Sequence, residues 1–564
     1  MRPPDWAVLV ASVVIVTLYG LWRGRHSDNV DRYLRAERSL PWYAMALSIM
    51  ATQASAITFI STTGQSYVDG MRFLQFYFGL PLAMILISAY VVPVFHRANV
   101  YTAYEYLEQR FDAKTRILVS LIFLIQRGLA VGVALSAPAI VLTVILGWPD
   151  RWTTLIMGAV VVFYTVMGGI QAVTWTDFQQ MFIMLAGLFL ALATAVLLLP
   201  PQVSFLDAMT LAGAAGKLNA VTLRFDWNDQ FNLWSGLFGG MFLMLAYFGC
   251  DQSQVQRYLT GKSITQSRLS LLFNAVAKLP MQFFILFTGA MVFVFFTFEM
   301  PPAVFQREAL ARASRQAAFP DVQKKFAMRF EERKRAAMSL IEARRNRDAD
   351  LLGKRAAEYR EAQKQFEVAR NEALRLAREA SGEPSLNDAN YIFLTFVTRY
   401  LPAGLVGLVM AAIFAAAMST ISAEINSLAT VTVIDIYRRH ICRSGSDRHY
   451  LVVSRLATAL WGAYAIVTAQ YARNLGSLIV VVNQVGSLFY GGLLGVFVLA
   501  FACKRVNGTA AFTGVLCGEM AIFAAHFYGK IAFLWYNMIG CVVVVGSALL
   551  VSAHIERKRR QLHG

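Results

Sequence analysis

Charged residues are scarce in this chain. Only 15% of its 564 residues are Asp, Glu, Lys or Arg, whereas 57% are hydrophobic. Soluble globular domains carry about 25% charged residues and do not contain repeated apolar runs long enough to cross a bilayer. The composition therefore excludes a soluble protein and indicates an all-α integral membrane protein.

Cysteine is also rare. The five residues are Cys250, Cys442, Cys503, Cys517 and Cys541. An odd number without a CxxC spacing favours neither a disulfide framework nor a metal site. We expect free thiols.

Sequence motifs for enzymes and for nucleic-acid binding are missing as well. The chain has no HExxH, GxSxG or Walker sequence at a suitable depth, which argues against an enzyme and against a nucleotide-driven pump. Its net charge of +18 comes from Lys and Arg dispersed over membrane loops and one inserted segment, without a zinc finger or an RNA-binding motif. We expect no enzymatic activity and no nucleic-acid partner.

Apolar runs of spanning length are abundant, and we count about thirteen of them. The first, Trp6–Leu21, is followed by Arg23 and Arg25 rather than by a small-residue cleavage site, so we expect a retained span. Lys and Arg gather in alternate short loops, which by the positive-inside rule places the N-terminus outside and the C-terminus in the cytoplasm. The sequence thus predicts a multi-pass protein of a bacterial-type inner membrane.

One long apolar helix, Ala411–Tyr437, carries polar residues in its interior. At about 100° per residue, Ala416, Ser419 and Thr420 share one narrow face. Lipid offers hydroxyl groups no partner, so such groups face protein, water or an ion. Two interpretations stay open: the hydroxyls bond to carbonyls of their own helix, or they supply oxygens to a small hard cation.

Two other spans have the polar and small residues of interrupted helices. The sequence TQAS at 52–55 falls near the middle of the second span, and GCDQ at 249–252 ends the seventh. Unwound carbonyls at such a break can coordinate a cation. Interrupted helices in corresponding positions predict an inverted repeat of five plus five helices, the LeuT-like arrangement.

The expected segments follow from these positions. They are 1-39 (first span and cytoplasmic loop), 40-199 (first repeat), 200-230 (extracytoplasmic loop), 231-503 (second repeat, interrupted by 301-390) and 504-564 (two last spans and a basic cytoplasmic tail). The segment 301-390 is rich in Ala, Arg, Glu and Lys and has helical propensity. We expect an extracytoplasmic helical insertion, either a solvated accessory domain or a docking surface for a protein partner or anionic lipid.

Five fragments in order resemble the sodium/solute symporter family. They are SAITFISTTGQSYVDG (55–70), YTAYEYLEQRFD (101–112), YTVMGGIQAVTWTDFQQ (164–180), GCDQSQVQRYL (249–259) and LPAGLVGLVMAAIFAAAMSTISAEINSLATVTVIDIY (401–437). The resemblance covers nearly the whole chain except the insertion, and it is nearest to the iodide, monocarboxylate and multivitamin branch. It implies symport of a small solute with Na⁺ by alternating access. A transport-like membrane sensor and a proton-coupled carrier are the alternatives.

The resemblance also implies ion sites. In the family, carbonyls at the break of the second span and a carbonyl with two hydroxyls on the long polar helix hold sodium. Carried over, these residues are Ala51, Ala54, Ala416, Ser419 and Thr420. A second cation site is expected from Asp177, Ser422 and Glu424, where Glu424 departs from the family's usual uncharged residue. The alternative is that Asp177 and Glu424 are salt-bridged or solvated.

The solute is expected at the midplane between the broken helices. The candidate wall residues are Gln53, Ser55, Thr58, Phe73, Gln75, Tyr77, Arg127, Tyr247, Phe248, Lys278, Asn483 and Gln484. Arg127 interrupts an apolar span, and its guanidinium fork suits a carboxylate. We therefore expect a small organic anion rather than a sugar or another neutral solute. An ion pair of Arg127 with Asp177, Asp251 or Glu424 is the alternative, and Lys278 could be structural.

Overall fold

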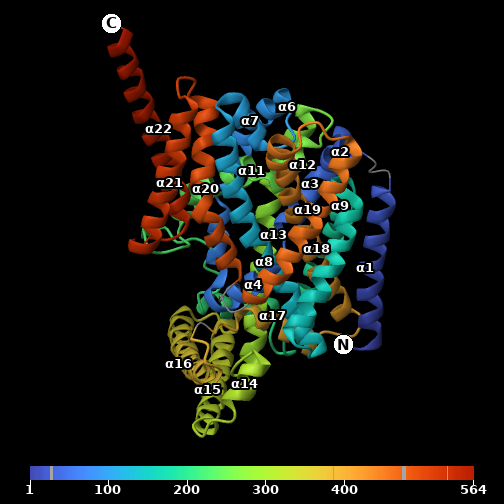
Figure 1. Cartoon of the computed structure of the whole chain (residues 1–564). Helices are drawn as coiled ribbons and strands as arrows, with labels where there is room; N and C mark the ends of the chain where they lie inside the picture. The colour runs from blue at the N-terminus through green and yellow to red at the C-terminus, as the bar shows by residue number, and fades with distance from the viewer. Residues whose placement is uncertain (26–28, 385, 473–477, 530, 564) are drawn as a thin grey trace.

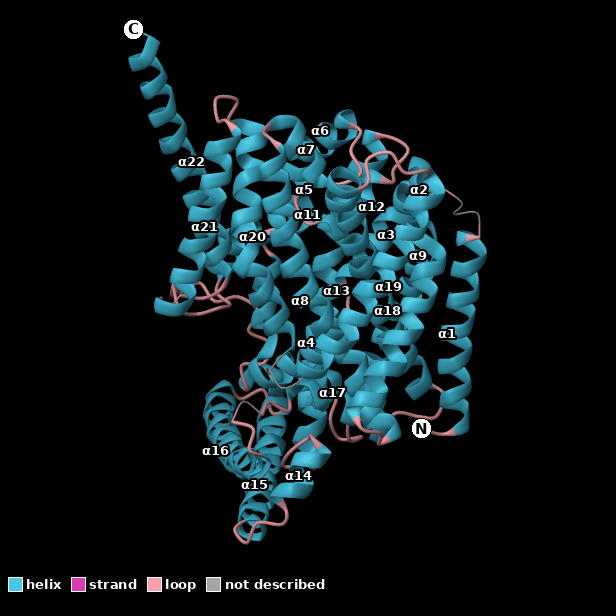
Figure 2. Ribbon diagram, in the orientation of Figure 1, coloured by secondary structure: helices cyan, strands magenta, loops and turns pink. Residues whose placement is uncertain are grey.

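A computed structural model describes residues 1–25, 29–384, 386–472, 478–529 and 531–563. These residues are helical almost throughout and contain no β-strand beyond one isolated bridge between Leu40 and Gly261 (Figure 2). The all-α membrane fold that the composition predicts is confirmed.

Thirteen helices precede the insertion. In chain order they are α1 (Pro3–Gly24), α2 (Val30–Arg35), α3 (Trp42–Gln53), α4 (Ala56–Asp69), α5 (Leu80–Leu86), α6 (Val92–Ala98), α7 (Ala103–Arg110), α8 (Ala113–Leu146), α9 (Asp150–Leu197), α10 (Phe205–Ala214), α11 (Gly240–Gly249), α12 (Gln252–Leu259) and α13 (Ile264–Phe298). The helices of the insertion and after it are α14 (Arg307–Ala313), α15 (Phe319–Arg345), α16 (Ala349–Ser381), α17 (Ala389–Tyr400), α18 (Leu405–Val431), α19 (Asp447–Ala472), α20 (Leu478–Ala502), α21 (Gly508–Tyr528) and α22 (Leu534–His563). Tighter 3₁₀ segments span Ala36–Arg38 and Gly70–Tyr77, and wider π segments span Ile87–Val91, Ser235–Gly239 and Thr432–Ile441.

Within the described residues, ten helical stretches are long and apolar enough to cross a membrane. One of them, α9, has 48 residues and would measure about 72 Å if straight, more than twice the thickness of a bilayer core. Gly169 interrupts it with φ +58°. The thirteen predicted crossings follow from these ten stretches. The helix α9 counts as two crossings, α4 and α5–α6 count separately, and the broken pair α11–α12 adds one more.

The two interrupted helices are present. Ala54, with φ −89° and ψ +63°, ends α3, and α4 begins two residues later. Cys250 ends α11, and Asp251 caps α12 by accepting a hydrogen bond from the amide of Ser253. These breaks give the five-plus-five core its two unwound points. The segment limits 1-39, 40-199, 200-230, 231-503 and 504-564 stay predictions.

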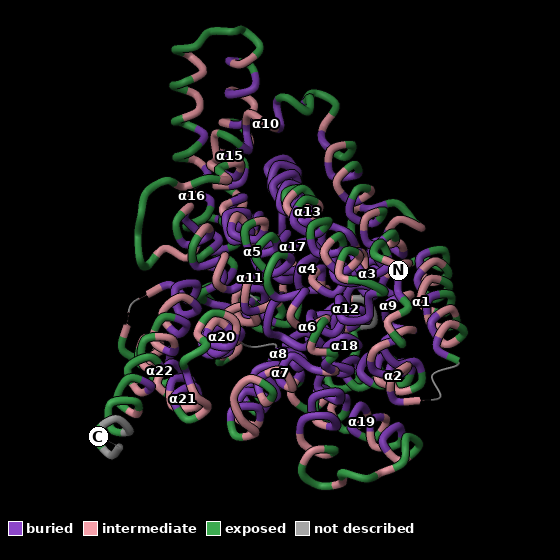
Figure 3. The backbone as a smooth tube through the Cα atoms, turned by 90° about the horizontal axis from the view of Figure 1, so that it is seen from above, coloured by how far each residue is buried: buried purple, intermediate pink, exposed green. Residues whose placement is uncertain are grey.

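The helix α18 forms the centre of the molecule. Every residue from Val409 to Val431 is buried, and the view from above shows α18, α12 and α8 surrounded by helices with exposed outer faces (Figure 3). Small residues explain this position, because they let backbones approach closely. At Gly187 of α9, for example, an added Cβ would lie 2.6 Å from Cβ of Ala412.

The insertion is a helical hairpin of α15 and α16 preceded by the short α14, as predicted. It lies at the same end of the molecule as the N-terminus, opposite to the C-terminus (Figure 1). Arg333 of α15 is fully buried and donates a hydrogen bond to the carbonyl oxygen of Phe296 at the end of α13. Arg344 and Arg345 form ion pairs with Asp207 of α10. The hairpin is therefore fixed to the rest of the molecule by one buried and two partly exposed charged contacts.

Candidate functional site

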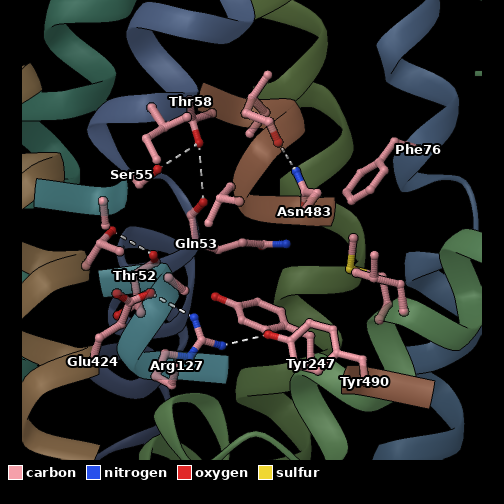
Figure 4. A pocket seen from close by; sticks show the side chains of 18 of the residues that line it. Thr52, Gln53, Ser55, Thr58, Phe76, Arg127, Tyr247, Glu424, Asn483 and Tyr490 are labelled. Carbon is pink, nitrogen blue, oxygen red and sulfur yellow. Dashed lines mark hydrogen bonds and ion pairs between the residues drawn. The ribbon is translucent and has the colours of Figure 1, made fainter. Parts of the chain in front are cut away.

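A cavity of about 90 Å³ lies between the two broken helices. Its size corresponds to roughly three water molecules. Residues from α3, α4, the 3₁₀ segment Gly70–Tyr77, α8, α11, α18 and α20 converge on it (Figure 4). The lining residues are Thr52, Gln53, Ser55, Ile57, Thr58, Phe76, Tyr77, Gln126, Arg127, Ala130, Ala134, Leu243, Met244, Tyr247, Thr420, Glu424, Ile479, Val482, Asn483 and Tyr490.

The helix α18 meets the first break directly. The hydroxyl of Thr420 donates a hydrogen bond of 2.9 Å to the carbonyl oxygen of Thr52. Ser419, on the same face, is fully buried, and its Oγ makes no hydrogen bond of normal geometry among the described residues, although it interacts with the carboxylate of Asp177. At the break, the amide of Ala54 bonds back to the carbonyls of Met50 and Ala51. The geometry therefore places a buried hydroxyl next to an unwound turn, an arrangement that suits a cation site between the two helices.

Asp177 of α9 adds a negative charge beside this contact. Its Oδ2 accepts a hydrogen bond of 2.6 Å from Ser48 and lies 3.0 Å from Nη1 of Arg257. Its other oxygen, like the hydroxyl of Thr52, is buried without a hydrogen bond of normal geometry in the described chain, although Ser419 and Thr52 both interact with the carboxylate. Buried oxygens that lack donors suit a small hard cation. Of the five residues expected to hold sodium, Ser419 and Thr420 lie beside these oxygens, and the full ligand set stays a prediction.

Arg127 is held in a buried network rather than left free. Its Nη1 donates a hydrogen bond of 2.8 Å to Oε1 of Glu424, and its Nη2 donates one of 2.7 Å to the hydroxyl of Tyr490. Nη2 also pairs with Asp251, which accepts a further bond of 2.9 Å from Tyr490. Figure 4 shows the guanidinium between Glu424 and Tyr490 at one side of the cavity. The ion-pair alternative for Arg127 is thus the arrangement found.

The three residues expected to form a second cation site have different neighbours. Asp177 pairs with Arg257, whereas Glu424 pairs with Arg127. The hydroxyl of Ser422 donates to the carbonyl of Ser419 in its own helix. This arrangement argues against one cation held between the two carboxylates. A cation at either carboxylate stays a prediction.

Seven of the predicted wall residues line the cavity: Gln53, Ser55, Thr58, Tyr77, Arg127, Tyr247 and Asn483. The structure places the other five elsewhere. Phe73 packs in an aromatic cluster, 5.2 Å between ring centroids from Phe76. Gln75 bonds to the backbone of Thr222 and Phe231. Phe248 is fully buried behind Tyr247, and Gln484 lines a separate cavity.

Lys278 of α13, the fifth of these residues, lies just behind the cavity wall. It is fully buried, and its Nζ has no hydrogen bond or ion pair within the described residues. Nζ lies over the ring of Tyr77, at 5.3 Å from the ring centroid. Because Tyr77 lines the cavity, one ring separates an unpaired amine from the enclosed space.

Sequence reasoning missed two contributors to the site. Tyr490 is part of the arginine network, and Gln126 lines the cavity. Gln126 precedes Arg127 in an apolar run, which was a signal. Tyr490 is one tyrosine among many in this chain, and nothing local distinguishes it.

Comparisons with known proteins agree with this geometry. The model of the sodium:solute symporter family matches residues 33–326 and 374–518, which leaves out only part of the insertion and the chain ends. The human sodium/iodide cotransporter is 26% identical over 91% of this chain and 68% of its own length. Human sodium-coupled monocarboxylate transporter 1 is 27% identical over 91% and 72%, and the sodium/sialic acid symporter SiaT of Proteus mirabilis (strain HI4320) is 24% identical over 96% and 93%.

A solved structure gives the same answer for the fold. A Na⁺-coupled sialic acid symporter in a substrate-bound outward-open state superposes with a TM-score of 0.76 over 98% of both chains, at 23% sequence identity. These relatives are membrane transporters rather than enzymes, and their solutes differ. The chain belongs to the sodium:solute symporter family and is a sodium-coupled solute symporter.

Proposed function

We propose that this symporter imports a small organic anion, such as a carboxylate, together with sodium by alternating access. The observation that carries the proposal is Lys278, an amine buried without a partner behind the wall of the central cavity. An unpaired buried charge costs several kcal/mol, so this amine carries its charge at low cost only when a ligand supplies the opposite charge.

The charges around the cavity favour Lys278 over Arg127 as the anion-binding group. Arg127 already has Asp251 and Glu424 as partners, so its positive charge is more than balanced. Lys278 has no such partner in the described chain. A carboxylate that reached past Tyr77 would give the amine its counter-charge, and Gln53 and Asn483 would offer amide groups to its polar atoms.

The lining of the cavity supports a solute with an apolar part. Phe76, Leu243 and Met244 make part of the wall apolar. A short carboxylate with a few carbon atoms fits a wall of this kind. The amide groups of Gln53, Gln126 and Asn483 favour a neutral polar solute as the second candidate, because amides bind hydroxyl groups as well as carboxylates.

Sodium would complete the same site. Oxygens of Ala51, Ala54, Ala416, Ser419 and Thr420 are the proposed ligands. A cation bound between α18 and the first break would fix α3 and α4, which carry Gln53, Ser55 and Thr58, and so shape the wall of the cavity. The coupling between sodium and solute must then be reciprocal.

The orientation of the protein in the membrane is part of the proposal. The N-terminus and the insertion would face outward, and the C-terminus the cytoplasm of a bacterial-type cell, because short loops at the C-terminal end carry most Lys and Arg. A protein partner at 301-390 stays a prediction.

A thermal-shift screen of the purified protein tests the proposal. Short carboxylates, sugars and amino acids would each be tested in sodium and in potassium. We expect a carboxylate to raise Tm in sodium only, Lys278→Met to abolish the rise and Lys278→Arg to retain part of it. Stabilisation by a neutral solute that persists in Lys278→Met would overturn the anion proposal and support the second candidate.

A further inference from the structure

A glutamate outside the transport site has no counter-charge. Glu519 lies near the middle of α21, one of the candidate membrane-spanning helices. The helices α20, α21 and α22 pack together at the side of the molecule (Figure 3). Ionisable residues at mid-depth in a membrane helix are rare and mark functional sites by default.

The carboxyl group of Glu519 points into the seam between α21 and α20. Only 9% of the residue is exposed, and both carboxyl oxygens are buried. Oε1 lies against Gly492, where an added Cβ would come within 2.0 Å of it. A glycine at this position of α20 thus leaves the room that the carboxyl group occupies.

No cation compensates this carboxyl group in the part of the chain that the structure describes. Glu519 has neither an ion pair nor a hydrogen bond there. The helix α8 meets α21 at its end, where Asp112 lies beside Gly508. An ionised carboxylate in these surroundings would be uncompensated in a medium of low dielectric constant.

We propose that Glu519 is a proton-binding site, a carboxylic acid kept neutral inside the α20–α22 unit, and therefore the residue that hydrophobic carbodiimides modify. The site is separate from the arginine network and from the proposed sodium ligands. Its proton comes from water, and its ligand class is a hydrophobic reagent that reacts with a protonated acid.

The mechanism of the carbodiimide reaction explains why it should select Glu519 over the paired carboxylates. The O–H of the acid adds across one C=N bond of the carbodiimide, so that the proton goes to nitrogen and the carboxyl oxygen to the central carbon. The acyl group then shifts to nitrogen and gives a stable N-acylurea, with no leaving group. A carboxylate without a proton cannot take the first step, so Asp177, Asp251 and Glu424, which are paired with arginines, should not react.

Mass spectrometry of the full-length protein in detergent tests the site without knowledge of the solute. Dicyclohexylcarbodiimide at pH 8 should add its whole mass to the peptide that contains Glu519. The exposed glutamates Glu358 and Glu379, which form ion pairs with arginines, serve as internal controls that should stay unlabelled. A water-soluble carbodiimide near pH 5 should label those two and spare Glu519.

Infrared spectroscopy tests the protonation of Glu519 without a reagent that has to reach the residue. The infrared carbonyl band of a protonated carboxylic acid should be present in the wild type at pH 8 and absent in Glu519→Gln, while Glu358→Gln leaves it unchanged. Its absence from the folded wild type would overturn the proposal. Labelling of Asp251 or Glu424 as strongly as Glu519 would also overturn it, because charge pairing would then not decide reactivity.

Discussion

Arg127 of α8 and Glu424 of α18 are joined by a buried hydrogen bond of 2.8 Å although they lie 297 residues apart in the chain. The same guanidinium binds Asp251 at the second helix break. One positive charge therefore serves two carboxylates, and it connects the helix with the proposed sodium ligands to the second broken helix.

Because Arg127 is shared between two carboxylates, substitutions of Glu424 and of Arg127 should lower the stability by different amounts. Glu424→Gln leaves Arg127 paired with Asp251, so we expect a change in stability of no more than about 1 kcal/mol. Arg127→Met leaves both carboxylates buried without a partner and should destabilise by about 3–5 kcal/mol. Thermal unfolding in detergent would rank the two variants. Equal losses would show that the network does not share its charge in this way.

The same Glu424→Gln variant tests the predicted second cation. If Glu424 holds a cation that is transported with the solute, the Hill coefficient for sodium in solute binding should fall in the variant. An unchanged coefficient would leave Glu424 as a structural partner of Arg127 alone. Asp177→Asn, which alters the other carboxylate, is the matched comparison.

Substitutions on the polar face of α18 test the proposed sodium site. Ser419→Ala and Thr420→Val each remove one oxygen, a loss of about 1–3 kcal/mol, which corresponds to a roughly tenfold or larger rise in the sodium concentration for half-maximal stabilisation. Ser427→Ala is the control, because that hydroxyl donates to the carbonyl of Glu424 in its own helix. A similar shift in the control would mean that general weakening of α18, and not loss of a ligand, causes the effect.

The ion pairs between Asp207 of α10 and the insertion should weaken at low pH, which gives a prediction with a definite sign. Burial alone would raise the pKa of Asp207, but hydrogen bonds from Arg345, Ser204 and Arg344 lower it to about 2. A lowered pKa means that the stabilisation is complete above the unfolded value of about 4 and is lost as the pH falls towards 2. The protection factors for amide hydrogen exchange at the end of α15 should therefore stay constant from pH 7 to pH 5, and Asp207→Asn should lower them already at pH 7. Unchanged protection factors in the variant would mean that the arginines do not fix the hairpin.

Local patterns in the sequence predicted the helices and the breaks, and they predicted which hydroxyls share a face of α18. Ala416, Ser419 and Thr420 follow from helical periodicity alone. Phe73 and Gln75 were misplaced because they lie in a 3₁₀ segment, whose side chains follow a different register from an α-helix. The partner of Arg127 remained open, since three acidic residues on distant segments were equally available until the helices were packed together. Glu519 went unnoticed because its only distinguishing property, the lack of a partner, is a property of the folded molecule.

The contact between α1 and α18 gives a last prediction. Oδ1 of Asp5 accepts hydrogen bonds of 2.6 Å from the amide of Gly404 and 3.2 Å from that of Gly407, at the start of α18. Asp5 is 1% exposed, and these amides belong to the first turn of the helix, where no carbonyl of the helix itself can accept from them. Asp5→Ala should lower stability by about 1–2 kcal/mol, as the loss of a capping residue does. Asp5→Asn keeps one acceptor oxygen and should lose less.

Because α18 also carries the proposed sodium ligands, we expect the sodium-dependent rise in Tm to keep its midpoint concentration in both variants, which separates a capping role from a role in ion binding. A shifted midpoint in Asp5→Asn would instead show that the position of α18 at the sodium site depends on the N-terminal helix.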